Sequence, residues 1–77
     1  MKNKKQLIES LSVLEHEQWM TWAKNILETE NISSETRTRW EQYFVPYHDL
    51  PEDIKNLDRP FAQKSLELFE QYLKENN

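Results

Sequence analysis

Apolar residues recur at helical spacing along the first third of the chain. This pattern predicts a first helix from about Lys4 to Glu28, since residues roughly 100° apart around an axis form one apolar face. We expect that face to pack into the core of the protein. It consists of Leu7, Leu11, Leu14, Trp22 and Ile26.

Two polar residues, Glu15 and Gln18, project from the same predicted face. A buried acceptor without a partner costs about 1 to 3 kcal/mol. Glu15 therefore predicts a nearby Arg, Lys or Tyr side chain, or a cleft that opens beside it. Gln18 has the same two interpretations, an internal hydrogen bond to the aromatic loop or a contact with a ligand.

Two further helices follow from cap residues and spacing. Ser33 or Ser34 is a suitable N-cap for a second helix that ends at Trp40 or Tyr43. Asp58 is a suitable cap, and Pro60 a suitable first residue, for a last helix that runs to about Lys74. In that helix the residues predicted to face the core are Ala62, Leu66, Phe69 and Leu73.

The segment between the second and last helices combines aromatic and β-branched residues with proline. In Phe44-Val45-Pro46-Tyr47 the proline favours an extended conformation of Val45, so a short strand or extended arm is expected. A short turn with Pro51 near its start follows. Because an extended arm has unpaired backbone groups, it tends to pair with another chain, which favours a symmetric homodimer.

Composition supports one small helical domain. The chain has 77 residues, three Trp, no Gly and no Cys. Without glycine the tight hairpin turns lose their preferred residue, so the predicted class is mostly α, with three to four helices in a single domain over residues 1–77. Without cysteine neither disulfides nor a cysteine-bound zinc can reinforce so small a core, which leaves aromatic packing and self-association.

The same composition argues against several functions. A net charge of −4 does not suit nucleic-acid binding, and the missing glycines exclude P-loop and dinucleotide-binding fingerprints. No apolar run is long enough to span a bilayer and the N-terminus does not resemble a signal peptide, so we expect a cytoplasmic protein with no membrane contact.

Catalytic and metal-binding patterns are incomplete. The segment from His16 to Met20 begins like the zinc motif H-E-x-x-H, but Met20 stands where the second histidine is required. There is no cysteine nucleophile and no glycine-built oxyanion loop. We therefore predict a protein that is not an enzyme, with no catalytic residues, no metal and no cofactor, in which His16 is a hydrogen-bonded packing residue.

An ordered series of short motifs resembles the RyR domain, the repeated module of ryanodine receptors that also occurs alone in bacterial and phage proteins. The series runs over roughly residues 8–70. It departs from the family pattern between Ile26 and Tyr43, so contacts of that region are not transferred. The motifs are His16-Glu17-x-Trp19, Val45-Pro46-Tyr47, Leu50-Pro51, Lys55, Asp58-Arg59 and Ala62.

The resemblance implies a helical fold and, since the receptors carry two repeats about a pseudo-twofold axis, a homodimer for a single-copy chain. It also implies a role in binding or sequestering a nucleotide-derived signal in a phage or bacterium. An adaptor that grips another protein with the same aromatic loop is the alternative. The candidate ligand-binding residues are Glu15, Gln18, Trp19, Tyr43, Tyr47, Lys55, Asp58 and Arg59.

Within this set an aromatic face beside a cation suits a flat base attached to an anion. Tyr47 and Arg59 are the strongest candidates. Lys55, Asp58 and Arg59 have a second interpretation, an internal salt-bridge group around the start of the last helix. The other large aromatics, Trp22 and Trp40, are expected in the core.

Overall fold

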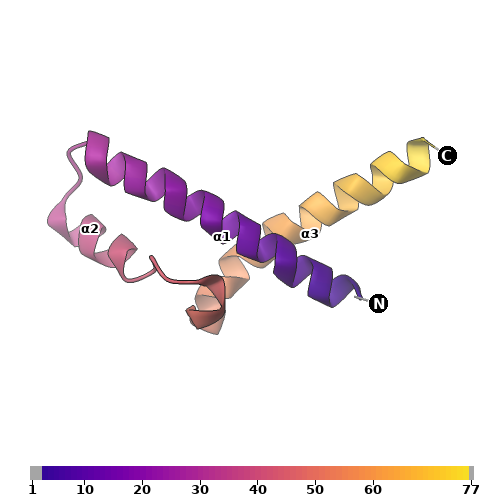
Figure 1. Ribbon diagram of the computed structural model, residues 1–77, viewed down its shortest axis with the longest axis horizontal. Helices are drawn as coiled ribbons and strands as arrows, with labels where there is room; N and C mark the ends of the chain where they lie inside the picture. The colour runs from indigo at the N-terminus through magenta and orange to yellow at the C-terminus, as the bar shows by residue number, and fades with distance from the viewer. Residues whose placement is uncertain (1–2, 77) are drawn as a thin grey trace.

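Two long helices that cross each other dominate the computed structural model, which describes residues 3–76 (Figure 1). They run in opposite directions, so both ends of the described chain lie on the same side of the molecule. The predicted mostly helical class is confirmed. In chain order the elements are α1 (Lys4–Thr29), α2 (Ser34–Glu41), the 3₁₀ turn η1 (Tyr47–Asp49) and α3 (Glu52–Glu75).

The starts of α1 and α2 are fixed by side-chain caps. The Asn3 side chain accepts a hydrogen bond from the backbone of Gln6, whose own side chain accepts one from the backbone N–H of Asn3. The Ser33 hydroxyl accepts a hydrogen bond from the backbone N–H of Thr36 at 3.2 Å. The sequence therefore placed the first helix within one residue, and the prediction of Ser33 as a cap is confirmed.

The prediction for the start of the last helix is wrong. Helix α3 begins at Glu52, directly after Pro51, and continues through Pro60. Glu52 and Asp53 favour this earlier start because acidic side chains in a first turn interact well with the helix dipole. Pro60 costs the helix one backbone hydrogen bond, but it does not end it. Asp58 consequently lies inside α3 and is not a cap.

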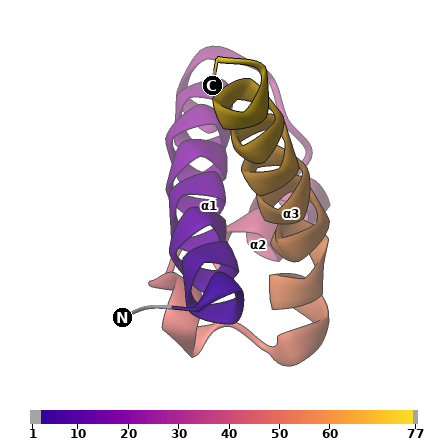
Figure 2. The same ribbon diagram turned by 90° about the vertical axis from the view of Figure 1, so that its right-hand side faces the viewer.

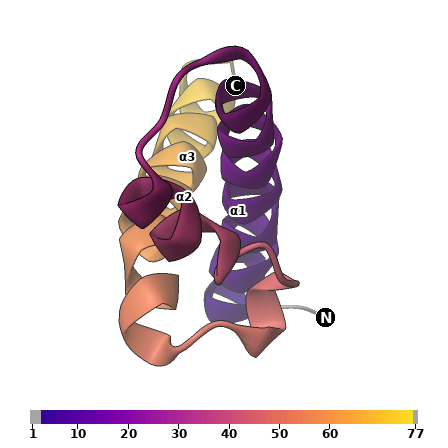
Figure 3. The same ribbon diagram turned by 90° about the vertical axis from the view of Figure 1, so that its left-hand side faces the viewer.

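The segment between α2 and α3 is not a strand, and no strand occurs within residues 3–76. It lies against α1 (Figure 3), and its backbone groups bond within the chain. The Val45 carbonyl accepts a hydrogen bond from the His16 ring at 2.7 Å, and the Asp49 N–H donates to the Pro46 carbonyl at 2.9 Å. An arm held in this way does not support the expected pairing with another chain.

The core is small and lies where α1 meets α3 and η1; an end-on view shows α1 and α3 side by side (Figure 2). The stripe of α1 expected to be buried is largely exposed: Trp22, for example, keeps 52% of its surface accessible. A neighbouring stripe of α1, which includes the small residues Ser12 and Ala23, packs instead. The buried residues are Ser12, His16, Ala23, Leu27, Tyr47, Leu50, Ala62 and Leu66.

The apolar stripe of α3 is buried over only part of its length. Ala62 and Leu66 are buried as predicted, whereas Phe69 and Leu73 are exposed because α3 diverges from α1 toward its C-terminal end (Figure 1). Among the described residues no helix is both long enough and apolar enough to cross a membrane.

Candidate functional site

Aromatic rings from three parts of the chain meet around Trp19. Its ring is stacked on His16, with centroids 5.9 Å apart, and lies edge-on to Trp40 of α2 at 6.2 Å. Phe44 approaches the same ring at 5.6 Å. These contacts attach α2 and the following segment to α1, so Trp19 has a structural role as well as an exposed edge.

A cleft of about 350 Å³ opens beside this aromatic cluster, between α1, α2 and the first half of α3. Its volume is at the lower end of the range of ligand pockets in proteins, about 300 to 1,000 Å³. We call it the aromatic cleft. Its lining residues are His16, Trp19, Arg39, Trp40, Tyr43, Ile54, Leu57, Asp58 and Phe61.

Asp58 supplies the carboxylate of the aromatic cleft. It is half-buried, and its side chain makes no hydrogen bond or ion pair with another residue in the range 3–76. Burial raises the pKa of this carboxyl above its usual value, and the nearby Glu15 raises it further, while His16 acts in the opposite direction. A partly desolvated carboxylate without a partner is poised to accept hydrogen bonds from a ligand.

Arg39 supplies the cation of the cleft. It is exposed on α2, and within the described residues its guanidinium forms no ion pair. His16, by contrast, is buried and bound through Nε2 to the Val45 carbonyl. The prediction of His16 as a hydrogen-bonded packing residue is confirmed. The cleft thus combines a partly exposed aromatic wall, a carboxylate in the wall and an arginine at the edge.

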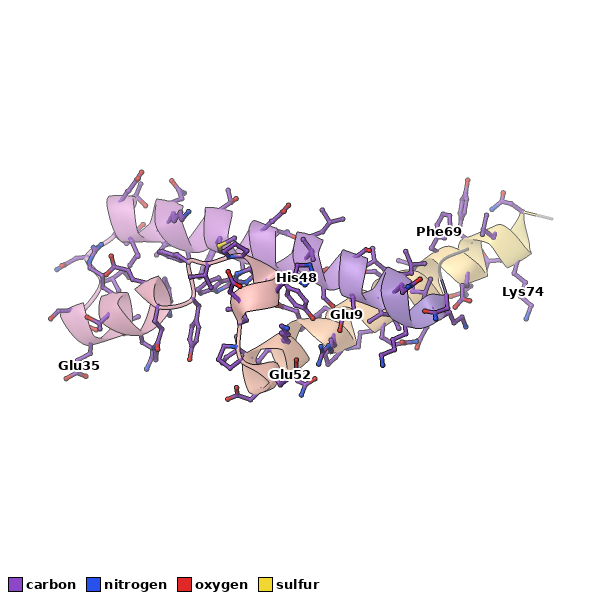
Figure 4. The ribbon with its side chains drawn as sticks, turned by 60° about the horizontal axis from the view of Figure 1, so that its bottom comes forward. Glu9, Glu35, His48, Glu52, Phe69 and Lys74 are labelled. Carbon is purple, nitrogen blue, oxygen red and sulfur yellow. The ribbon has the colours of Figure 1, made fainter. Side chains whose placement is uncertain are left out.

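A second polar cluster, the Arg59 network, lies on the other side of α3. Arg59 donates to Glu9 of α1 at 2.6 Å and to Glu52 at 2.9 Å. The Tyr47 hydroxyl donates to the second Glu9 oxygen at 2.5 Å, and the Lys55 ammonium lies 5.5 Å from the Tyr47 ring centre. Figure 4 shows Glu9 and Glu52 approaching this region from α1 and α3.

These bonds favour the internal interpretation of Lys55 and Arg59. Lys55 pairs with Glu52 at 3.5 Å, and both terminal nitrogens of Arg59 donate to carboxylates. Asp58 does not join them, because adjacent helix residues project about 100° apart. Tyr47 is only 3% exposed and so belongs to the core. The structure therefore separates Tyr47, Lys55 and Arg59 from the aromatic cleft.

Glu15 and Gln18 border a shallower depression that adjoins the cleft and shares Trp19, Asp58 and Phe61 with it. Neither side chain forms a hydrogen bond to another residue in the described part of the chain. Of the two interpretations of Glu15, an opening beside the helix fits better than an internal bond. Gln18 is exposed, so it is no misfit in the core.

Trp19, Tyr43 and Asp58 are thus the candidate residues that meet in the cleft. Sequence reasoning missed the contributions of Ile54, Leu57 and Phe61, which depend on α3 starting before Asp58. It also missed Glu9, for which the sequence gives no signal. Among residues 3–76 no three His, Cys, Asp or Glu side chains come together to hold a metal ion.

Comparisons with known proteins add no further assignment. No protein-family model matches the sequence, and searches of curated proteins and of solved structures found no significant match. The RyR resemblance stays a prediction from the sequence.

The Arg59 network predicts a loss of stability in acid. Hydrogen bonds from Arg59 lower the pKa of Glu9 and Glu52 below their usual value of 4.5, with a further contribution from Tyr47 at Glu9. A carboxyl with a lowered pKa in the folded state stabilises above its unfolded pKa, and this stabilisation is lost as the pH falls. We expect the melting temperature to fall below about pH 4.5, as measured by circular dichroism.

Glu9→Gln is the test for this assignment. The amide cannot titrate, so the variant should be less stable at neutral pH and lose less stability on acidification than the parent protein. The raised pKa of Asp58 acts in the opposite sense, since protonation removes its burial penalty. An unchanged acid dependence in Glu9→Gln would contradict the role of the network.

Proposed function

We propose that this protein binds a small nucleotide-type ligand in the aromatic cleft, without catalysing a reaction on it. The observation that carries the proposal is the unpaired, half-buried carboxylate of Asp58 beside the Trp19 and Trp40 rings. A planar base is a suitable partner because it offers a stacking face and N–H donors at its edge.

The arrangement of charges narrows the ligand class. Guanine carries two adjacent N–H donors on one edge, which match the two oxygens of a carboxylate, so guanine derivatives should bind best. Arg39 at the edge of the cleft is suited to a phosphate attached to that base. The size of the cleft fits one base better than a second stacked one.

The biological role proposed on this basis is the binding or sequestration of a nucleotide-derived signal, as the RyR resemblance implies. A sequestering protein must bind its ligand tightly but does not need to catalyse a reaction on it. The cleft fits that requirement because its polar groups, Asp58 and Arg39, are placed to hold a ligand.

The test is a thermal-shift series with guanosine, guanosine and adenosine monophosphates, and cyclic dinucleotides. Ligands that bind the folded state raise the melting temperature by mass action. We expect the guanine monophosphate to give the largest shift among the mononucleotides. No shift with any compound of the panel would overturn the proposal.

Two variants and one control assign the contacts. Asp58→Asn should remove the preference for guanine, because an amide offers only one acceptor to two donors. Arg39→Gln removes the proposed phosphate contact, so guanosine and its monophosphate should then raise the melting temperature by the same amount. Glu52→Gln lies in the Arg59 network, outside the cleft, and should leave the ligand-induced shift unchanged. Retention of the guanine preference in Asp58→Asn would contradict the assigned contact.

An adaptor function is the second candidate. Leu57 and Phe61 at the edge of the cleft are exposed, and such side chains suit insertion of an apolar segment of another protein. The ligand series separates the two candidates. Without any nucleotide shift, a purified partner that binds the parent protein and not Trp40→Ala would favour the adaptor.

A further inference from the structure

We infer that a second copy of this chain packs against one side of the α1 and α3 pair. The inference rests on exposed apolar residues, of which Phe61 also borders the aromatic cleft, and it does not depend on the proposed ligand. We call this surface the helical face. It is defined by Leu7 and Leu14 of α1 with Phe61, Leu68 and Tyr72 of α3, all of them exposed.

Helix α3 has two adjacent apolar stripes. The first includes Ala62 and Leu66, which pack against the rest of the chain. The second, Phe61, Leu68 and Tyr72, repeats at intervals of seven and four residues, which is the spacing of a helix that packs against another helix. Leu68 is 69% exposed. A helix with two apolar stripes is expected to have two partners, and the chain itself supplies one.

The exposed stripe of α1 lies on the same side of the molecule. At one end Phe61 of α3 and Gln18 of α1 border the same depression. At the other end the exposed side chains of Lys4 and Glu70 pair at 3.1 Å and link the start of α1 to the C-terminal half of α3. Leu7 and Leu14 follow Gln18 toward the start of α1 on the same helical face. The two stripes therefore form one continuous surface.

The exposed area is larger than a monomer of this mass requires. A folded chain of 9.4 kDa is expected to expose about 5,000 Å², whereas this one exposes 6149 Å². The excess of about 1,100 Å² exceeds the roughly 800 Å² that each partner buries in a standard interface. The radius of gyration, 15.3 Å, is likewise larger than the roughly 11.5 Å expected of a compact domain of this length.

The middle of the helical face carries few charged side chains. A chain with a net charge of −4 repels its own copy, so an interface between two copies needs a surface of this kind. On α1 the positions in line with Leu7 and Leu14 are Gln18 and Asn25, both uncharged, and on α3 the uncharged Ser65 lies between Phe61 and Leu68. The charged residues Glu15 and Asp58 border the depression at the Phe61 end of the face. Two such faces would place α1 and α3 of one copy against those of the other.

Light scattering on the purified full chain tests this inference. We expect a mass of twice 9.4 kDa at micromolar concentration, together with a melting temperature that rises with protein concentration. A monomer whose melting temperature does not depend on concentration would overturn the inference. An assembly of three or more copies would also overturn it.

Leu68→Glu and Leu14→Glu locate the interface. Both side chains are exposed within one chain, 69% and 59% respectively, so their replacement should leave the helical circular dichroism intact and convert the dimer to a monomer. Thr38→Glu on α2 adds the same charge at an exposed position away from the face and should remain dimeric. Dimers that persist in both leucine variants would show that another surface is used.

Discussion

Replacing Tyr47 by alanine should lower the free energy of unfolding by about 3 to 5 kcal/mol, the usual cost of removing a large aromatic from a core. A chain of 77 residues has a total stability of only about 4 to 12 kcal/mol, so the variant should be close to unfolding. The expectation follows from the burial of Tyr47 at the contact between η1 and α1. Urea unfolding followed by circular dichroism measures the change.

The environment of Tyr47 explains why the effect is large. The ring lies 6.5 Å from that of His16, and its hydroxyl donates to Glu9. Burial raises the pKa of the phenol, and the bond to the Glu9 carboxylate adds to this effect, so the hydroxyl stays a donor at neutral pH. Alanine would remove the ring contact and leave Glu9 with Arg59 alone.

Two further variants separate the ring from the hydroxyl. Tyr47→Phe keeps the ring and loses one hydrogen bond to a partly exposed carboxylate, so it should cost about 1 kcal/mol. His48→Ala removes an exposed neighbour on the same 3₁₀ turn and should be nearly neutral. If Tyr47→Ala were as mild as His48→Ala, Tyr47 would not be part of the core.

The helical class and the ends of α1 could be predicted from the sequence, but the start of α3 and the buried face of α1 could not. The leucine stripe of α1 has the strongest apolar pattern, yet the residues that pack inside include Ser12 and Ala23. Small side chains allow packed segments to approach closely. A hydrophobicity pattern does not indicate which helix face allows this close approach. The exposed leucines Leu7 and Leu14 would contribute to stability only if another surface packed against them.

The candidate site could be predicted only in part, because its composition depends on where α3 begins. Asp58 and Arg59 are neighbours in the sequence, and a helix starting at Pro60 would have put both in one capping turn. Because α3 begins at Glu52, the two side chains project from different sides of a continuous helix. Asp58 reaches the aromatic cleft with Trp19, and Arg59 reaches Glu9. The start of one helix therefore decides which residues share a site.

His16→Ala is the second substitution expected to have a large effect, about 2 to 4 kcal/mol on the free energy of unfolding. The side chain is 3% exposed, stacks on Trp19 and bonds to the Val45 carbonyl. Its loss would leave both a cavity and an acceptor without its partner. Because Val45 belongs to the segment between α2 and η1, hydrogen exchange should accelerate first at the backbone amides of that segment.

His16→Gln distinguishes the hydrogen bond from the packing. The glutamine amide can donate to the Val45 carbonyl as Nε2 does, but it offers no ring to Trp19. It should therefore recover part of the stability lost in His16→Ala and most of the amide protection. Equal losses in the two variants would show that the ring contact carries the effect. A neutral His16→Ala would mean that His16 does not hold this segment on α1, and that another contact forms the wall of the aromatic cleft.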